Sequence, residues 1–332
     1  MPSSSFPQPK ISRGALARAT AVFALLAGAL ASFAQENTLP AAAPPPVRMA
    51  YSLSVFIGLN PADARNAIAI VTKNFAQEST LGMDVAHLIY ENTEELAQLI
   101  DGGTVYAVNM NTPEYWLLRE KARLDRFLVN IRNGTETETY LLLTRADGPL
   151  KSLAELQGKR LNVLTNSAMV LATVWLDVEL AKATLPTTTK FFAPPSDFFK
   201  PAKVVLPVFF GQADACLTTR SSYALMVELN PQVGKQLRII ASSPPLIPLL
   251  YGFRDNCEPK AKEGAIHTMV TMHNTISGRQ TLALSQIEEI AERPATTFDA
   301  SLALLDEHAR LCPEASARLL ATLRGKIRVS AP

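Results

Sequence analysis

Short apolar segments alternate with capped helical segments from residue 47 onward, and this alternation restricts the fold more than any other feature. Val47–Ser52 and Val85–Tyr90 have the composition of strands. Between them, Pro61 begins a segment whose apolar residues recur at helical spacing as far as Phe75. Strands that are separated by helices of this length form βαβ units with a largely parallel sheet. The sequence therefore predicts an α/β fold.

The same alternation begins again after residue 150. Residues 153–156 are typical of a short helical turn, and 159–164 of a strand. Asn166 and Ser167 have the composition of a helix cap, and we expect that helix to continue to about residue 183. Further helix and strand segments follow over 204–217 and 237–241. Two α/β halves are thus expected in one chain.

Two long apolar segments are expected to connect the halves. Residues 139–144 read as a buried strand, and the proline-rich segment 244–251 marks a second crossing. The chain would then leave the first lobe, build the second and return, with a ligand cleft between them. The expected boundaries are 47–140 plus 248–330 for lobe 1 and 141–247 for lobe 2. Helices expected in the returning part cover about 259–277, 280–292 and 300–311.

Residues 1–34 have the order of a secretory signal. Three basic residues and no acid precede an apolar run over 21–30, and small residues satisfy a cleavage rule at Ala34 and at Ala31. The run is shorter than the roughly 20 residues that a bilayer span needs. We expect cleavage and a periplasmic protein, with a Pro- and Ala-rich linker over 35–46. A membrane-anchoring helix is the alternative.

Charge and composition restrict the partners. Removal of residues 1–34 takes away three positive charges and no negative one, so the formal net charge changes from +2 to −1. The mature chain therefore lacks the basic excess typical of nucleic-acid-binding proteins. A chain of 332 residues with 48% hydrophobic residues can form one to three compact units. We expect a monomer that binds no nucleic acid.

The three cysteines match no zinc-binding spacing. In an oxidising compartment, an odd number allows at most one internal bridge. Cys257 and Cys312 are the candidate disulfide pair, because the expected architecture places both in lobe 1. Three unpaired thiols, including Cys216, are the alternative.

Several segments resemble a known family, the periplasmic solute-binding proteins of the phosphate, phosphite and phosphonate ABC transporter group. The similar segments are Leu-Ala-Glu-Leu-Gln-Gly-Lys-Arg at 153–160, Gly-Gln-Ala-Asp-Ala at 211–215, and the strand with two prolines at 237–245. The resemblance extends over about 47–311. It implies a two-lobed type 2 periplasmic binding fold with two mixed or parallel sheets flanked by helices.

The same resemblance implies a function. Members of the family close on a small solute, here expected to be anionic and phosphonate-like, and deliver it to the inner-membrane permease of an ABC transporter. It implies no cofactor and no metal. A cradle rich in Ser and Thr is expected at Thr165, Asn166 and Ser167, where a strand meets a helix whose free N–H groups attract anions. Ala168 and Met169 depart from the family pattern, and they fit a larger or less charged solute.

Other candidate ligand-binding residues lie at strand ends. In lobe 1 they are Tyr51, Ser52, Asn111, Thr112 and Tyr115, and in lobe 2 they are Thr218 and Arg220. Arg220 is the candidate cation, because a guanidinium pairs bidentately with carboxylate or phosphoryl oxygens. Helix capping, a core position for Tyr115 and a solvated Arg220 are the alternatives.

The sequence does not indicate an enzyme. The four histidines, His87, His267, His273 and His308, show no i, i+4 pair, and the sequence contains no nucleophile elbow, phosphate-binding loop or dinucleotide turn. A receptor that signals to a membrane kinase would use the same cleft, and an enzyme of this fold would need an acid such as Glu114.

Overall fold

The computed structural model describes residues 46–58, 60–79 and 84–325. The expected signal peptide over 1–34 lies outside these residues, as does the linker over 35–46 apart from Pro46. Among the described helices, none is both long enough and apolar enough to cross a membrane.

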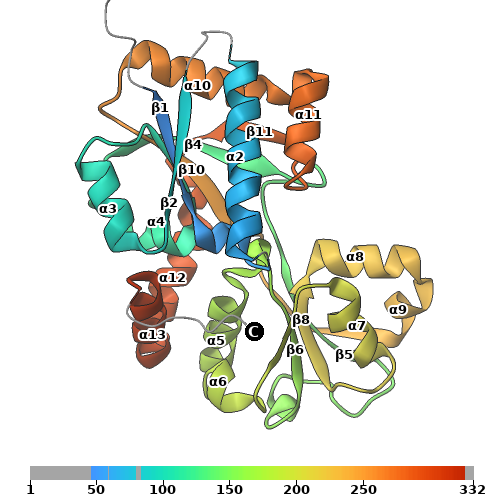
Figure 1. The fold of residues 1–332 in the computed structure, drawn as a ribbon. Coiled ribbons are helices and arrows are strands. Elements are labelled where there is room, and N and C mark those ends of the chain that lie inside the picture. Colours follow the sequence, from blue (N-terminus) through green and yellow to red (C-terminus); the bar gives the residue numbers. More distant parts are fainter. Residues whose placement is uncertain (1–45, 59, 80–83, 326–332) are drawn as a thin grey trace, which may run out of the picture. The chain divides into compact units, whose positions relative to one another are not determined.

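Two sheets organise the described chain, which confirms the predicted α/β class (Figure 1). The first has six strands in the order β11-β4-β10-β3-β1-β2. β1 is parallel to β2 and β3, whereas β10 is antiparallel to β3 and β4, and β11 is antiparallel to β4. The strands are β1 (Val47–Ser52), β2 (Val85–Tyr90), β3 (Ala107–Asn111), β4 (Leu124–Ile131), β10 (Leu249–Arg254) and β11 (Glu289–Arg293).

Helices bury both faces of this sheet, because its strands carry apolar side chains on each side. One face packs against α2 (Pro61–Glu78), α10 (Pro259–Thr271) and α11 (Ile276–Ala283), with Ile68, Met269 and Leu282 in the shared core. The other face packs against α3 (Thr93–Asp101) and α4 (Thr112–Leu118).

The second sheet has five strands in the order β7-β6-β8-β5-β9. β6 is parallel to β7 and β8, and β5 is antiparallel to β8 and β9. The strands are β5 (Tyr140–Arg145), β6 (Leu161–Leu164), β7 (Ser196–Phe198), β8 (Ala215–Thr219) and β9 (Leu237–Ser242). Its helices are α5 (Ala172–Lys182), α6 (Thr188–Phe191), α7 (Pro201–Phe209), α8 (Arg220–Leu229) and α9 (Pro231–Gln236). Trp175 of α5 is among the largest fully buried side chains.

Two extended crossings join the sheets. One runs from β4 to β5 and the other from β9 to β10, and they meet at Glu138 and Leu246. The two backbones exchange hydrogen bonds there, from Glu138 N to Leu246 O at 2.7 Å and from Leu246 N to Glu138 O at 2.8 Å. A short paired segment of this kind can bend while the sheets stay rigid.

α12 (Asp299–Leu311) contacts both halves of the fold. Its Leu304 and Leu305 belong to the core of the five-stranded half. Its Asp306 accepts a hydrogen bond from Trp116 Nε1 of α4 at 2.6 Å. α13 (Pro313–Leu323) packs on α12 and α4. The C-terminal helices therefore form a third connection between the halves, besides the two crossings.

The expected helix over 280–292 is wrong in its second half. α11 ends at Ala283, Gln286 adopts a left-handed φ of 54°, and residues 289–293 form β11. β11 pairs with β4, a strand that the sequence analysis did not identify. The pairing covers the edge of β4, whose free backbone groups a helix would leave unbonded.

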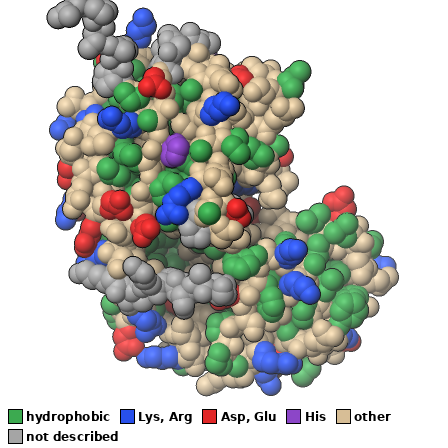
Figure 2. All heavy atoms as spheres, viewed as in Figure 1, with side chains coloured by type: hydrophobic (Ala, Val, Ile, Leu, Met, Phe, Trp, Pro, Cys, Tyr) green, Lys and Arg blue, Asp and Glu red, His purple; other side chains and the backbone are tan. Residues whose placement is uncertain are grey.

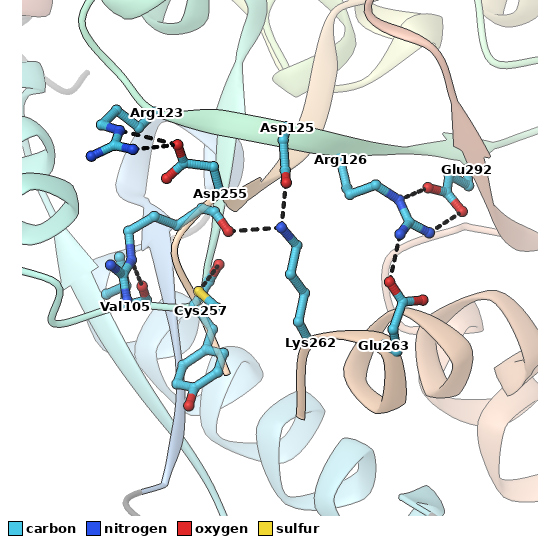
Figure 3. Close-up of polar contacts among 11 residues, drawn as sticks. Val105, Arg123, Asp125, Arg126, Asp255, Cys257, Lys262, Glu263 and Glu292 are labelled. Carbon is cyan, nitrogen blue, oxygen red and sulfur yellow. Dashed lines mark hydrogen bonds and ion pairs between the residues drawn. The ribbon is translucent and has the colours of Figure 1, made fainter. Parts of the chain in front are cut away.

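The expected disulfide between Cys257 and Cys312 does not form, and all three cysteines are free. The Cys257 thiol contacts Tyr106 O beside the six-stranded sheet (Figure 3). Cys312 contacts Asp177 O, on α5 of the other half. The two thiols therefore have separate surroundings, because the chain packs against the five-stranded half at α12, after β11.

Charged contacts connect α10 to β4, as Figure 3 shows. Lys262 is buried between Asp125 and the carbonyl oxygen of Arg254. Arg126 donates to Glu263 at 2.6 Å and also pairs with Glu292 of β11. Each of these charges has an opposite partner within the cluster, which connects α10, β4 and β11.

Apolar side chains are exposed on the five-stranded half. They gather over α7, α8 and α9 in Figure 2 and include Phe210, Leu225, Leu229 and Ile239. Leu229 is 71% exposed and Phe210 is 62% exposed. These side chains therefore lie outside the core that the helices share with the sheet.

A buried pair joins α5 to α12 and allows a test of the connection that α12 makes with the five-stranded half. Asp177 accepts a hydrogen bond from Thr188 N at 2.6 Å and lies 3.3 Å from His308 Nε2 of α12. Asp177→Ala should lower the free energy of unfolding by about 2–4 kcal/mol, because both partners would stay buried without a bond. Urea denaturation measures this change. Glu179→Ala, on the same helix but in an exposed pair with Lys182, should change it by less than about 0.5 kcal/mol. Equal effects of the two variants would contradict the role of Asp177.

Candidate ligand-binding site

Three strands that border the hollow described below end at one edge of the six-stranded sheet, where the parallel strand β2 also ends. β1 and β3 are parallel, and β4 runs the same way because β10 is antiparallel to both β3 and β4. Ser52, Asn111 and Ile131 are their last residues. The carboxyl ends of strands are the usual location of ligand sites in open α/β sheets.

A polar row crosses the sheet just before this edge. Tyr51 of β1 and Tyr251 of β10 both pair with Asn109 of β3, so the three side chains share one face. Tyr251 also pairs with Leu128 of β4. Asn130 follows two residues later, so it lies on the same face as Leu128.

Arg132 follows β4 at a tight turn. Asn133 and Gly134 have φ values of 50° and 70°, and Arg132 N donates to Thr135 O at 2.9 Å. This is the geometry that Asn-Gly favours in a two-residue hairpin turn. The Glu288 carboxylate accepts hydrogen bonds from the Asn133 and Gly134 amides, both at 3.0 Å. The backbone at Arg132 is therefore fixed both by the hydrogen bond within the turn and by the bonds from the turn to Glu288.

The polar row and Arg132 line a hollow of about 440 Å³, a volume that includes space open to solvent. Its polar wall consists of Ser167 from the five-stranded half and, from the six-stranded half, of Tyr51, Asn109, Asn130, Arg132, Tyr251 and Ser285. Ligand sites hold small molecules with a few polar groups that orient them, and this wall has such groups.

Arg132 supplies the positive charge of the hollow. Its Nη2 donates to Ser285 O at 3.3 Å. Within the described ranges it forms no salt bridge, whereas Arg126 and Arg293 both do. Burial lowers the pKa of Arg132, since desolvation penalises the charged form, while the negative charge of Glu138 acts in the opposite direction. The guanidinium remains cationic, and an anion would stabilise it.

Neutral hydrogen-bonding groups surround this charge. Asn130 is 8% exposed, and its side-chain oxygen is buried without a hydrogen-bond partner in the described part of the chain. Burial raises the pKa of Tyr251 to about 12 and raises the pKa of Tyr51 still further. Both phenols therefore stay protonated at neutral pH and can donate a hydrogen bond.

Ser52 and Asn111 lie behind the edge, in a cluster around a buried acid. Ser52 Oγ donates to Glu114 at 2.6 Å, Ser54 Oγ at 3.1 Å and Asn111 N at 2.9 Å. The Asn111 side chain accepts from Glu114 N, which completes a capping box at the start of α4. These groups satisfy one another, and neither Ser52 nor Asn111 lines the hollow.

Thr112 and Tyr115 face the protein interior. The fully buried Thr112 hydroxyl donates to Ile247 O. The Tyr115 ring packs against Phe127 and Phe298, with ring centroids 5.3 and 5.7 Å away. Both side chains support α4 from within the core.

Residues 165–167, the segment expected to form the cradle, do not lead directly into a long helix. Asn166 caps a 3-10 turn, η3 (Ser167–Met169), by accepting from Ala168 N, and α5 starts only at Ala172. The Thr165 hydroxyl donates to Asp197 at 3.1 Å. Of these three candidates, Ser167 lines the hollow. The long helix expected from residue 167 is therefore interrupted, and its free N–H groups lie further along the chain.

Thr218 and Arg220 lie elsewhere on β8 and α8. Thr218 is fully buried, and its hydroxyl has no partner among the described residues. Arg220 is exposed, and its Nη2 donates to Ser242 Oγ at 3.2 Å. Arg220 lines neither this hollow nor the second one described below.

Sequence reasoning missed Asn109, Asn130, Arg132 and Tyr251. A signal for two of them exists, because Val129 to Arg132 alternates between apolar and polar residues towards an Asn-Gly turn, which marks a strand that ends in a hairpin. The alternation puts Asn130 and Arg132 on one face of that strand. Nothing in the local sequence indicates which other strands meet this face.

Two α/β halves that are joined by extended crossings, with a polar hollow that both halves line, define a two-lobed solute-binding protein. A model of the family "ABC transporter, phosphonate, periplasmic substrate-binding protein" matches residues 58–295. The chain belongs to this family. Its members bind small solutes and deliver them to a membrane permease. No curated protein matches the chain.

Solved structures show the same fold. A binding protein component of an ABC phosphonate transporter from Pseudomonas aeruginosa is similar with a TM-score of 0.54 and 14% identity, over 85% of this chain and 97% of that one. PhnD1 from Prochlorococcus marinus, in complex with methylphosphonate, gives 0.53 and 12%, over 80% and 97%. A Xanthomonas citri protein bound to ATP gives 0.58 and 14%, over 80% and 97%. At these identities the likeness concerns the fold alone.

The buried acid behind the site makes stability depend on pH. Burial raises the pKa of Glu114, against the hydrogen bonds from Ser52 and Asn111. The native state then holds a proton that the unfolded chain releases, so its free energy of unfolding falls as the pH rises from the unfolded pKa through the folded one. Glu114→Gln should remove this contribution, so wild type should lose stability relative to the variant as the pH rises from 4 to 8. Urea denaturation at several pH values measures the difference.

Glu120→Gln is the matched control, because Glu120 is exposed just after the same helix. Its stability difference from wild type should stay constant over this range. A constant difference for Glu114→Gln as well would contradict the raised pKa.

Proposed function

We propose that this protein captures a small oxyanion in the hollow and that Arg132 is the cation that holds it. The single observation behind this proposal is a half-buried guanidinium without a carboxylate partner among the described residues, within a wall of neutral donors. An oxyanion would replace the water lost from Arg132, and charge-assisted hydrogen bonds of this kind are the strong ones. A phosphonate or a related anion fits this chemistry, as the family description suggests.

Capture would involve both halves. Tyr51, Asn109 and Arg132 lie on the six-stranded half and Ser167 on the other, so a bound anion would connect them. The crossings at Glu138 and Leu246 supply the hinge. Groups that are already ordered reduce the entropy that is lost on binding. The turn at Asn133 and Gly134 orders Arg132 before a ligand binds.

The cellular setting follows from the family. We propose that residues 1–34 direct export and are cleaved, that the protein acts as a periplasmic monomer, and that its partner is the permease of an ABC transporter. The role is binding without catalysis. The domain boundaries at residues 140 and 247 remain part of this proposal.

Replacement of the cation tests the site. Arg132→Gln should weaken binding of methylphosphonate or propylphosphonate by about 10- to 100-fold, because a hydrogen bond to a charged group contributes roughly 1.5–3 kcal/mol. Isothermal titration calorimetry of the purified protein measures the dissociation constants. A thermal-shift screen detects binding first, since a ligand at 100 times its dissociation constant adds about 2.7 kcal/mol of stability.

Arg220→Gln is the matched control. It removes a guanidinium from the other half of the fold, at the position that the sequence alone favoured, and it should change the affinity by less than about twofold. A large loss with Arg220→Gln and none with Arg132→Gln would reverse the assignment of the cation.

A further inference from the structure

A second hollow lies beside the first and has a different chemistry. It measures about 420 Å³, again with the part open to solvent. Its wall lies between the sheet and the helices α2, α10 and α11. The side chains that line it and not the first hollow are mostly apolar, among them Met49, Phe75, Met269, Met272, Leu282 and Ile290.

The two hollows adjoin each other. Tyr51, Val71, Tyr251, Ser285 and Ile287 line both of them. The two tyrosines belong to the polar row that continues to Arg132. A molecule held at Arg132 therefore has apolar space within reach, on the same face of the sheet.

Two of the polar groups that line the second hollow, the hydroxyls of Thr281 and Tyr51, already have partners within the protein. The Thr281 hydroxyl donates to Ser277 O at 3.0 Å and accepts from Asn74 Nδ2 at 2.8 Å. The Tyr51 hydroxyl points to the sulfur of Met49, at 3.8 Å. A polar ligand group would find few partners there and would lose its water. Methionines, in contrast, adapt to apolar groups of different shapes.

We propose that the solute is an organic oxyanion with an apolar substituent of several carbons, such as an alkylphosphonate longer than methylphosphonate. The oxyanion binds at Arg132 and the substituent occupies the methionine-lined hollow. This inference rests on the proposed function, since it needs the anion at Arg132. It goes further because it assigns the apolar hollow a role in selecting the solute.

The chain-length dependence of affinity tests this proposal on the unaltered protein. Calorimetry with methyl-, propyl-, butyl- and pentylphosphonate should give dissociation constants that fall about three- to fourfold for each added methylene until the hollow is filled. Butylphosphonate should bind at least about tenfold more tightly than methylphosphonate. Inorganic phosphate, which has no substituent, should bind more weakly than butylphosphonate.

A pair of variants locates the effect. Met269 is 3% exposed and lines the second hollow only. Met269→Phe reduces the space and should weaken butylphosphonate at least about fivefold while leaving methylphosphonate within about twofold. Met269→Leu conserves the volume and should leave both affinities within about twofold.

The outcomes separate this inference from the proposed function. If affinity rises with chain length, and Arg132→Gln weakens every member of the series, both stand. If methylphosphonate binds as tightly as butylphosphonate and Arg132→Gln weakens both, the apolar role of the hollow is overturned and oxyanion capture stands. If no member of the series binds, or if binding does not depend on Arg132, the proposed function falls and this inference falls with it.

Discussion

The site depends on the guanidinium of Arg132, which is partly removed from water and has no carboxylate within salt-bridge distance among the described residues. Holding Arg132 in this state costs free energy, because desolvation disfavours the charge. The surrounding structure keeps it in place, through the Asn-Gly turn that Glu288 anchors and through the carbonyl oxygen of Ser285. An anion that replaces the missing water gains most at such a position. Neutral donors then orient the anion without neutralising the cation.

The connections between the halves decide how such a site can close. The crossings meet at one bonded pair, Glu138 and Leu246, which leaves little structure to resist bending. α12 adds a stiffer connection, since Leu304 and Leu305 pack in the five-stranded half and Asp306 bonds to α4. Closure therefore has to preserve the contacts of α12 or exchange them. The buried Asp177–His308 contact is the most enclosed of these contacts.

Much of the architecture was accessible from the sequence, because strands and helices have local periods. The elements at Val47–Ser52, Pro61–Glu78 and Val85–Tyr90 begin where the apolar pattern and the helix start predict. The strand over residues 289–293 could not be predicted from the sequence, because it forms by pairing with β4 rather than through the propensity of its own residues. The sequence indicated Tyr51 and Ser167 as candidates, because they lie near or just after the end of an expected strand. The structure places both in the wall of the hollow. Tyr115 was a candidate for the same reason, because it also follows the end of a strand, and yet its side chain lies in the core.

The sequence by itself determined the α/β class with two halves, most of the order of the elements apart from β4 and β11, and several places where strands end in polar residues. Only the tertiary structure decided which of those ends meet. Arg132 and Arg220 both follow a strand, the first before an Asn-Gly turn and the second at the start of a helix, and neither feature indicates which of them faces the other half. Strand order and the crossings place the first in a shared hollow and leave the second in solvent, because contacts between distant segments depend on the packing of the whole chain. The adjoining apolar space has the same origin, since α2, α10 and α11 come from opposite ends of the sequence.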